Sequence, residues 1–432
     1  MIRIINKPGW LYLLYGIMAW WALQQYLNIQ SVNVILGIVA LPIVMTVQRD
    51  HKGSSRYGWI ALCFALASIW LPVKTLLFFT IVFACFFITE TFTGKLNLLP
   101  VLAAGLMSPL FQYVSNVVSF PLRLRITGMA GACMNAIGLK TAVAGNMILY
   151  NGSEFSVDPA CMGLNMLAVC LLLQLMLVAV FQKQQGVQVK VWVVLALLAA
   201  ALFMNVVSNL FRIISLVWLN ILPGTVMHDI VGLFCLMLYV VLPMIVVTRW
   251  AVARFGTVPV NTAVGSKKPW VVHVLLLMST CYAAFTIAQH ANKNNGAAVP
   301  VVDGYRATRI DAEIVKLENE QSLVYIKRIP GFYNADHHPM ICWKGSGYAF
   351  NKVKKQGLVY TAVLQNGPDR LYTAWWYDNG SSRTTEQMSW RWDMMKGAPN
   401  YSLVNVTAAS EWQLQQIINS LMKQHTLKPA LQ

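Results

Sequence analysis

The sequence has few charged residues. Only 11% of its 432 residues are Asp, Glu, Lys or Arg, whereas 57% are hydrophobic, and the mean hydropathy is +0.55. A soluble protein of this length could not remove so much apolar surface from water. The composition therefore excludes an ordinary soluble globular protein and predicts a chain that lies largely in lipid.

Acidic residues are scarce. The chain has 16 Asp and Glu against 33 Lys and Arg, which gives a formal net charge of +17. In a soluble protein this excess would indicate a nucleic-acid partner, but in a membrane protein basic residues gather in cytoplasmic loops and orient the spans. We therefore interpret the charge as a sign of topology and expect no nucleic-acid partner.

Paired cysteines and common cofactor motifs are missing. The eight cysteines are scattered, mostly within apolar runs, and no CxxC pair occurs. This pattern argues against a disulfide framework and against a thiolate metal site. The sequence also has no P-loop, EF-hand or HExxH motif, so we expect no metal and no other cofactor.

Nine apolar stretches are long enough to cross a membrane. They lie near residues 10–27, 33–47, 57–73, 75–90, 97–115, 161–181, 191–211, 229–248 and 270–288. The run 213–222 is too short to cross, and we predict a re-entrant or interfacial piece; if it did span, every later segment would change sides. No cleavage site follows the first run, which we expect to be retained.

The distribution of Lys and Arg orients these spans. With the amino terminus inside, the cytoplasmic segments carry twelve Lys and Arg, while the outside loops up to residue 288 carry five. This is the bias that the positive-inside rule requires. The predicted fold is an all-α polytopic membrane domain at 1–288, with about nine transmembrane helices, followed by a segment outside the cytoplasm.

That last segment has a different character. Residues 289–432 carry sixteen of the 33 Lys and Arg and no run long enough to span, so we predict a linker at 289–304 and a soluble α+β domain at 305–432. The runs 358–365 and 370–380 flank an Asn-Gly pair, a pattern typical of a β-hairpin. A capping-box pattern then precedes a helix with one apolar face; these residues are Ser410 and Gln413, then Leu414, Ile417, Ile418, Leu421 and Met422.

Three polar residues stand at the outer ends of predicted spans. Cys161 opens the sixth span, Arg212 ends the seventh and His228 begins the eighth, so we expect them to share one cavity at the outer membrane face. A cysteine thiolate is a nucleophile, a histidine can take up and return its proton, and an arginine can hold an oxyanion or a carboxylate. Structural interpretations remain open: a cysteine often fills apolar space, as we expect of Cys170 and Cys235, and arginine often reaches to the interface.

The local sequence around these residues resembles the exosortase and archaeosortase family. VDPACMGLNML (157–167), NLFRIISL (209–216) and HDIVGLF (228–234) resemble its three motifs in the family's order, and the resemblance covers roughly residues 10–250. It implies that Cys161 is the nucleophile, His228 its partner and Arg212 the third essential residue. The sequence departs from the family at Met162, where Ser is common, and at 158–159, where a Glu often lies nearer the cysteine.

Four further residues belong to these motifs. Gly163 would let a backbone approach the nucleophile, and Asn209 and Gly232 accompany the arginine and the histidine. Asp229 either orients His228 or caps its helix, and the cap is favoured. The long outside loop at 116–160 is either a substrate vestibule or contains a short helix that the pattern does not reveal.

The soluble domain contains a second polar cluster, HHPMICWKGSGY (337–348). It resembles the His/Pro–Cys–Gly-x-Gly motif of a periplasmic domain that accompanies exosortases. His338 and Cys342 are therefore a possible secondary thiol site; the alternative is a buried cysteine beside turn-forming glycines. The fused arrangement is similar to the exosortase N type.

The resemblance implies a cysteine transpeptidase or endopeptidase of the bacterial inner membrane. Its substrates would be the C-terminal sorting tails of secreted proteins, its surroundings membrane lipid, and its second substrate either water or an amine on an envelope lipid or polysaccharide. Two other classes stay open: a membrane factor for envelope polysaccharide biosynthesis or export, and an anion transporter in which Arg212 binds the anion.

The predicted topology can be tested directly. Protease added to intact spheroplasts should digest residues 289–432, because nine spans and basic inner loops place them outside the cytoplasm. Immunoblotting for a carboxy-terminal tag would follow the digestion. Full protection of the tag, with digestion only after lysis, would show that the segments after Arg212 have the opposite sidedness.

Overall fold

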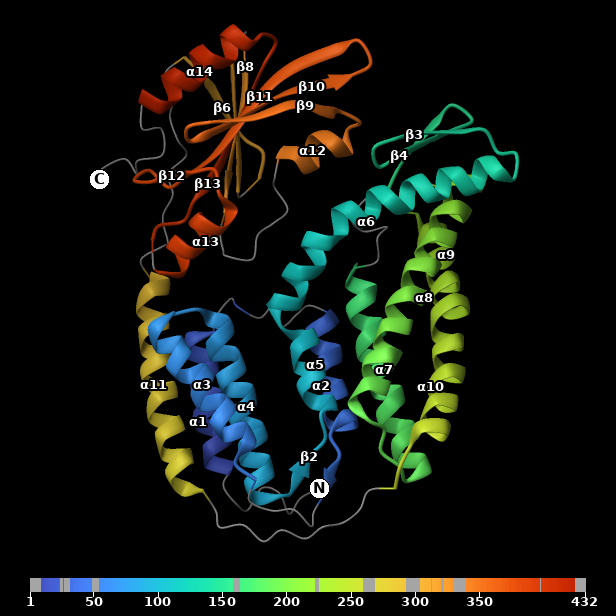
Figure 1. Cartoon of the computed structure of the whole chain (residues 1–432), viewed down its shortest axis with the longest axis vertical. Coiled ribbons are helices and arrows are strands. Elements are labelled where there is room, and N and C mark those ends of the chain that lie inside the picture. Colours follow the sequence, from blue (N-terminus) through green and yellow to red (C-terminus); the bar gives the residue numbers. More distant parts are fainter. Residues whose placement is uncertain are drawn as a thin grey trace. The chain divides into compact units, whose positions relative to one another are not determined.

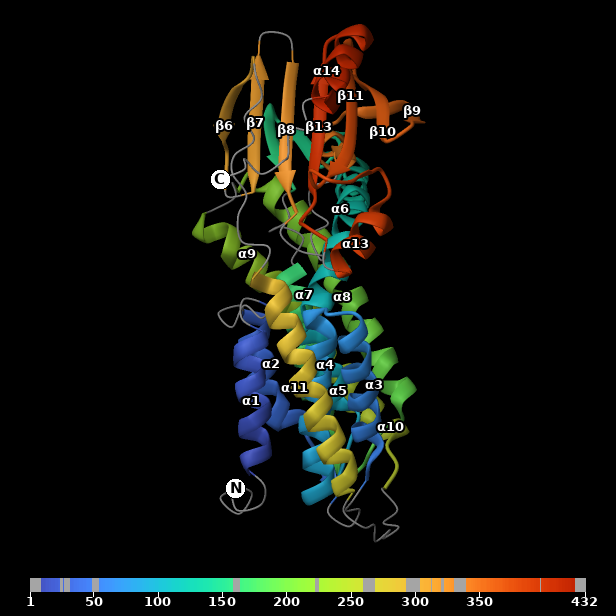
Figure 2. The ribbon, with the colours of Figure 1, turned by 90° about the vertical axis from the view of Figure 1, so that its left-hand side faces the viewer.

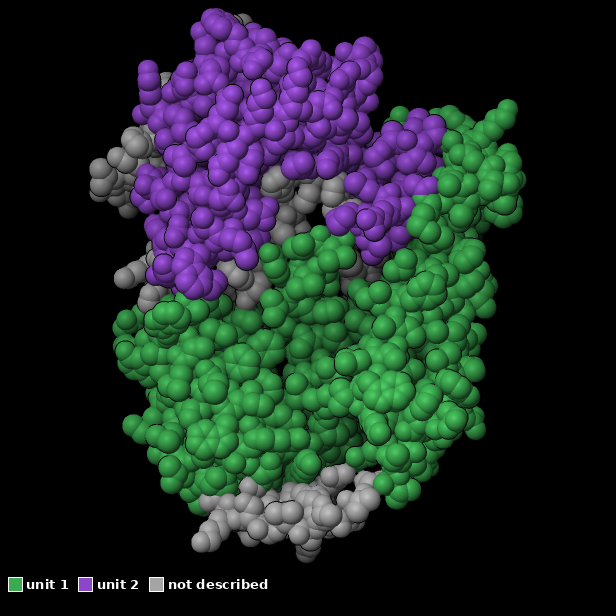
Figure 3. All heavy atoms as spheres, in the orientation of Figure 1, with its two compact units in different colours: residues 1–119, 129–141, 150–289 green, residues 120–128, 142–149, 290–432 purple. Residues whose placement is uncertain are grey.

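The computed structural model describes most of the chain in two compact units. The described residues are 9–23, 26, 32–48, 54–157, 164–221, 225–258, 269–292, 304–311, 313–319, 322–329, 339–396 and 398–423. The membrane unit comprises residues 1–119, 129–141 and 150–289, and the soluble unit comprises 120–128, 142–149 and 290–432 (Figure 3). Each unit is described separately below.

The first unit is built of apolar helices (Figure 1). Their bounds are α1 Gly9–Ala22, α2 Val32–Val44, α3 Arg56–Trp70, α4 Lys74–Phe92, α5 Leu99–Met107, α6 Pro109–Ala136, α7 Leu164–Gln185, α8 Val191–Trp218, α9 Val226–Leu236, α10 Leu242–Phe255 and α11 Trp270–Asn292. A π-helical segment, Met237–Val241, joins α9 to α10. Part of α6 is assigned to the soluble unit.

The helices support a membrane protein but not the expected number of spans. Within the described residues, five helices are long and apolar enough to cross a membrane, and a sixth is added if α5 and the start of α6, bent by 67°, form one span. Helices α1, α2 and α3 contain only 14, 13 and 15 residues. A membrane part is therefore confirmed, whereas nine spans are not.

Helix α8 corrects the interpretation of residues 213–222. Residues 213–218 do not form a separate re-entrant piece, because α8 runs without a break from Val191 to Trp218; residue 222 lies outside the described residues. The sequence contains no Gly or Pro between 191 and 222 that would end it, and the helix stops before Asn220, whose φ is 50°. Arg212 therefore lies inside the helix, six residues before its end, rather than at the end of a span.

The predicted loop at 116–160 is also largely regular structure. Helix α6 continues to Ala136, and strands β3 Thr141–Ala144, β4 Met147–Tyr150 and β5 Ser153–Ser156 form a three-stranded sheet in that order. Asn151 and Gly152 join β4 to β5 with φ of 50° and 78°. Asn-Gly with two positive φ values is a strong hairpin signal, and the sequence interpretation overlooked it here.

One ion pair ties α3 to α4 inside the membrane unit. Arg56 Nη2 lies 2.6 Å from Glu90 Oε1, its Nε donates to both carboxylate oxygens at 3.1 and 3.2 Å, and the Glu90 side chain is completely buried. The same Oε1 accepts from the backbone N–H of Leu96 at 2.8 Å. The carboxylate is thus fully partnered, which a buried charge requires.

The soluble unit contains one large antiparallel sheet (Figure 2). Its order is β6-β7-β8-β13-β11-β10-β9, with β12 paired to β11. The strands are β6 Arg306–Arg309, β7 Ile314–Asn319, β8 Ser322–Arg328, β9 Ala349–Gln356, β10 Val359–Asn366, β11 Asp369–Asp378, β12 Arg383–Thr384 and β13 Ser402–Ala408. Its helices are α12 Pro339–Gly345, α13 Gln387–Met395 and α14 Glu411–Lys423.

Alternating side chains on β11 build two cores. Trp376 and its neighbours on that face pack with Leu414, Ile418 and Leu421 of α14, whereas Trp375 packs on the opposite face with Trp390 of α13. The expected α+β architecture is therefore confirmed, as is the helix packed on the sheet. The expected hairpin is β10–β11, and the expected capping bond runs from the backbone N–H of residue 413 to Ser410 Oγ at 3.3 Å.

The predicted linker begins within a helix. Helix α11 extends to Asn292, four residues beyond the expected end of the last span, and residues 293–303 of the expected linker lie outside the described residues.

Candidate active site

A stripe of polar side chains runs along one face of α8. It consists of Asn205, Ser208, Asn209 and Arg212, which are between 6% and 9% exposed. Residues spaced by three and four lie above one another on a helix, so these four form one continuous face. Polar side chains are expensive inside a membrane bundle, and their concentration on a buried face indicates a functional site.

Arg212 lies against the backbone of α9. A Cβ atom placed on Gly232 would be 2.9 Å from Arg212 Cζ and Nε and 3.1 Å from Nη2, so glycine is what allows the guanidinium to come so close. Both residues are buried. The structure thus brings together the arginine of the second motif and the glycine of the third motif. The spacing of the two residues in the sequence does not reveal this contact.

The guanidinium retains an unused donor. Its Nε is buried, and no described residue accepts a hydrogen bond from it. Leaving a buried donor unsatisfied costs about 1–3 kcal/mol, more where the group is charged. An arginine kept in this state can donate to an acceptor that arrives later, such as a carbonyl oxygen or an oxyanion.

His228 lies on the same face of α9 as Gly232, because four residues separate them. It is 6% exposed and sits in the first turn of the helix. The prediction that Asp229 caps this helix was wrong. The N-cap is Thr225, whose Oγ1 accepts a hydrogen bond from the backbone N–H of His228 at 3.3 Å. Asp229 instead has an exposed side chain with Oδ1 3.4 Å from His228 Nδ1, at the edge of hydrogen-bond distance.

Helix α7 contacts the same polar face of α8 at Asn205. Cys170 Sγ accepts a hydrogen bond from Asn205 Nδ2 at 3.5 Å, and Gln174 Nε2 donates to Thr248 Oγ1 of α10 at 2.8 Å. These buried contacts fix α7 against α8 and α10. Cys170 is therefore buried and bonded to a neighbouring helix, which agrees with the structural role expected of it.

Cys161 itself precedes α7 by three residues and lies outside the described residues, as does Gly163. Its expected proximity to His228 therefore stays a prediction. His338 also lies outside the described residues, and Cys342 falls within α12. The possible secondary thiol site likewise stays a prediction.

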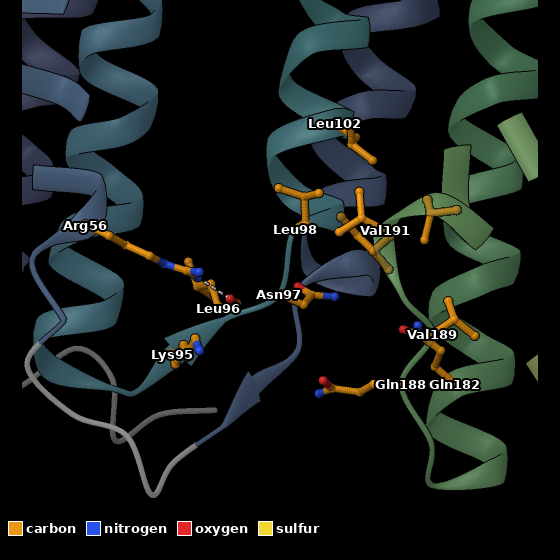
Figure 4. A pocket seen from close by; sticks show the side chains of 12 residues that line it. Arg56, Lys95, Leu96, Asn97, Leu98, Leu102, Gln182, Gln188, Val189 and Val191 are labelled. Atoms are coloured by element: carbon orange, nitrogen blue, oxygen red, sulfur yellow. Dashed lines mark hydrogen bonds between the residues drawn. The ribbon is translucent and has the colours of Figure 1, made fainter. Parts of the chain in front are cut away.

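A separate pocket lies at the start of α8 (Figure 4). Its volume is about 220 Å³, and its polar lining consists of Arg56, Lys95, Asn97, Gln182 and Gln188. Among the described residues that line it there is no Cys, His, Asp or Glu, so the pocket offers no thiol, imidazole or carboxylate. Val191 also lines it, about 30 Å along α8 from Arg212 at 1.5 Å per residue, which separates the pocket from the polar stripe.

Sequence reasoning missed Thr225, Asn205 and Ser208. The signal for Thr225 was a hydroxyl residue after Pro-Gly and three residues before His228, the usual position of a helix N-cap. The signal for the other two was their spacing of seven and four residues before Arg212 in an otherwise apolar run.

A family model described as transmembrane exosortase matches residues 20–245, which include the polar stripe of α8 and the first turn of α9. The match covers 226 of 432 residues, just over half of the chain. Comparison with curated proteins and with solved structures gives no match.

Two arginines of the membrane unit should respond oppositely to substitution. Arg212→Leu should leave the Tm of the detergent-purified protein unchanged or raise it, because it removes a buried cation with an unsatisfied donor. Arg56→Leu should lower Tm by about 5–10 °C, because it leaves the buried Glu90 carboxylate without its cation. Equal losses in both variants would mean that Arg212 is a structural tie.

Proposed function

Because the chain belongs to the transmembrane exosortase family, we propose that it is a membrane-embedded cysteine transpeptidase or endopeptidase acting on C-terminal sorting tails of secreted proteins. The observation that supports this best is the buried guanidinium of Arg212, which has an unused Nε donor and lies on the face of α9 that carries His228. An oriented cationic donor beside a buried histidine suits a reaction that develops negative charge on a carbonyl oxygen.

The proposed chemistry uses the three residues in sequence. His228 takes the thiol proton of Cys161, the thiolate attacks the scissile carbonyl, and Arg212 donates to the oxygen on which charge develops. Collapse of this intermediate breaks the peptide bond, and His228 returns the proton to the leaving amine. The remaining thioester is then attacked by an amine of the acceptor, which gives transpeptidation, or by water, which gives hydrolysis.

The surroundings follow from the same proposal. The tail's apolar helix would lie in the bilayer beside α7, α8 and α9, and its basic end would stay on the cytoplasmic side. The protein would be a multi-pass protein of the bacterial inner membrane, with its sheet domain in the periplasm. The amine acceptor would belong to an envelope lipid or polysaccharide.

The unused donor of Arg212 also favours a second candidate, an anion transporter. A thiol-directed probe on membranes separates the two, because only the enzyme needs a reactive thiolate at Cys161. Labelling that disappears in Cys161→Ala supports the enzyme. An unlabelled Cys161 together with anion uptake lost in Arg212→Leu would support the transporter.

Single substitutions at the proposed site should have unequal effects. Cys161→Ala should abolish processing and Cys161→Ser should leave at most a trace, while His228→Ala should be nearly as severe as Cys161→Ala. Arg212→Lys should lose about a hundred- to a thousandfold in rate, because an ammonium cannot reproduce the planar fork.

The measurement is conversion of a tail-bearing substrate to its shorter form at equal enzyme levels. Cys63→Ala is the matched control, since Cys63 is an exposed cysteine on α3, and it should process normally. His338→Ala and Cys342→Ala should also spare the reaction. Normal processing by Cys161→Ala would eliminate this mechanism, and loss in Cys342→Ala alone would move the active site to the sheet domain.

Gly232→Ala should slow processing about ten- to a hundredfold without harming the fold. Its new Cβ would lie 2.9 Å from the Arg212 guanidinium, which must turn away from its present direction, while alanine is the better helix former. Gly105→Ala on α5 is the matched control, because nothing lies within 4 Å of its new Cβ. Equal rates for the two variants would show that the position of the guanidinium does not matter.

A further inference from the structure

The turn between β3 and β4 lies close to the turn that follows α12. Although residues 142–149 lie in sequence between α6 and α7, they belong to the same compact unit as residues 290–432 (Figure 3). A Cβ atom placed on Gly145 would lie 2.5 Å from the carbonyl oxygen of Lys344, 2.9 Å from that of Gly345 and 3.1 Å from Gly347 N. This is a contact of backbone against backbone, which only glycine permits.

The segment that Gly145 contacts is a tight turn at the end of α12. Helix α12 ends at Gly345, and the chain then turns through Gly347, which has φ of 83°. The turn is closed by backbone bonds from Gly347 N to Lys344 O at 3.1 Å and from Tyr348 N to Trp343 O at 2.9 Å. A Cβ placed on Gly347 would lie 3.8 Å from Ala144 Cβ, so both sides of the contact are within van der Waals distance.

We propose that residues 144–145 and 344–347 form an intramolecular docking site, through which the soluble domain holds the hairpin that precedes α7. This assigns the Gly-Ser-Gly part of the 337–348 cluster to the recognition of a segment of the same chain. Strand β4 pairs with β5, which ends at Ser156, five residues before Cys161. The hairpin therefore links the docked domain to the chain segment that leads to the proposed nucleophile, and this consequence rests on the proposed function.

Glycine at position 145 has a matched counterpart in the same sheet. Gly145 and Gly152 both occupy turns with positive φ, 63° and 78°, so alanine introduces similar backbone strain at either position. Nothing lies within 4 Å of a Cβ on Gly152, whereas a Cβ on Gly145 would overlap backbone oxygen atoms that cannot move aside. The difference between the two alanine variants therefore measures docking rather than strain.

Disulfide trapping tests the docking without relying on any activity. Ala144→Cys with Gly347→Cys should cross-link in the full-length protein, because 3.8 Å is a normal Cβ–Cβ separation for a disulfide. The cysteine at position 347, where φ is 83°, introduces the same backbone strain in every variant compared, and the Gly347→Cys single variant measures its effect on folding. A protease site placed between residues 293 and 300 would be cut after oxidation, so that linked halves migrate together on a non-reducing gel. The two single-cysteine variants control for the native cysteines.

The glycine variants are then compared in this background. Adding Gly145→Ala should lower the cross-linked fraction at least about fivefold, since even one extra methyl group overpacks a close contact, while Gly152→Ala should leave it unchanged. Absence of the cross-link in the double-cysteine protein, or equal yields in the two alanine variants, would overturn the docking site.

Processing assays on the same variants test the consequence separately. Gly145→Ala in the otherwise native chain should reduce substrate conversion, Gly152→Ala should not, and the oxidised double-cysteine protein should remain active. A trapped hairpin together with normal conversion by Gly145→Ala would keep the docking site and remove its link to the nucleophile. If no variant and no wild-type protein processes the substrate, the proposed function fails while the cross-linking result still decides the docking.

Discussion

The cost of a polar group in an apolar surrounding governs the membrane unit. A buried charge or donor there either has a partner within the protein or is left unsatisfied at a cost, as at a site that binds a ligand. Two arginine sites show the two outcomes: Arg56, whose side chain is 41% exposed, pairs with the buried carboxylate of Glu90, whereas Arg212 is itself buried and keeps an Nε that no described residue satisfies. The first arrangement holds two helices together, and the second suits a binding or reacting site.

The position of Arg212 depends on the helices around it. The polar stripe of α8 faces inward and contacts both neighbouring helices. Cys170 of α7 accepts a hydrogen bond from Asn205, and the backbone of α9 at Gly232 lies against the guanidinium of Arg212. Thr225 fixes the first turn of α9 and with it the backbone of His228. Together these contacts place the guanidinium against the face of α9 that carries the histidine.

The soluble unit obeys a different rule, since water surrounds it and its stability comes from two apolar cores on one sheet. Strand β11 supplies both, because successive side chains point to opposite faces. The turn at 345–347, which follows α12, instead exposes its backbone. Glycines on both sides of the contact let the backbone around Gly145 come close. A packed domain and a sequence-distant hairpin are joined in this way by close approach of their backbones.

The sequence by itself determined the membrane class, the family, and the sheet domain with its hairpin and final helix, because hydropathy, alternation and capping are local patterns. It also identified Arg212, His228 and Gly232 as motif residues, since their neighbours in sequence carry the resemblance. It could not show that α8 continues past Arg212 or that Gly232 receives the guanidinium. Helix length depends on packing as well as propensity, and contacts between helices depend on rotation about their axes. Only the tertiary structure decided these points, and it alone brought Gly145 to residues 344–347, which lie some two hundred positions away.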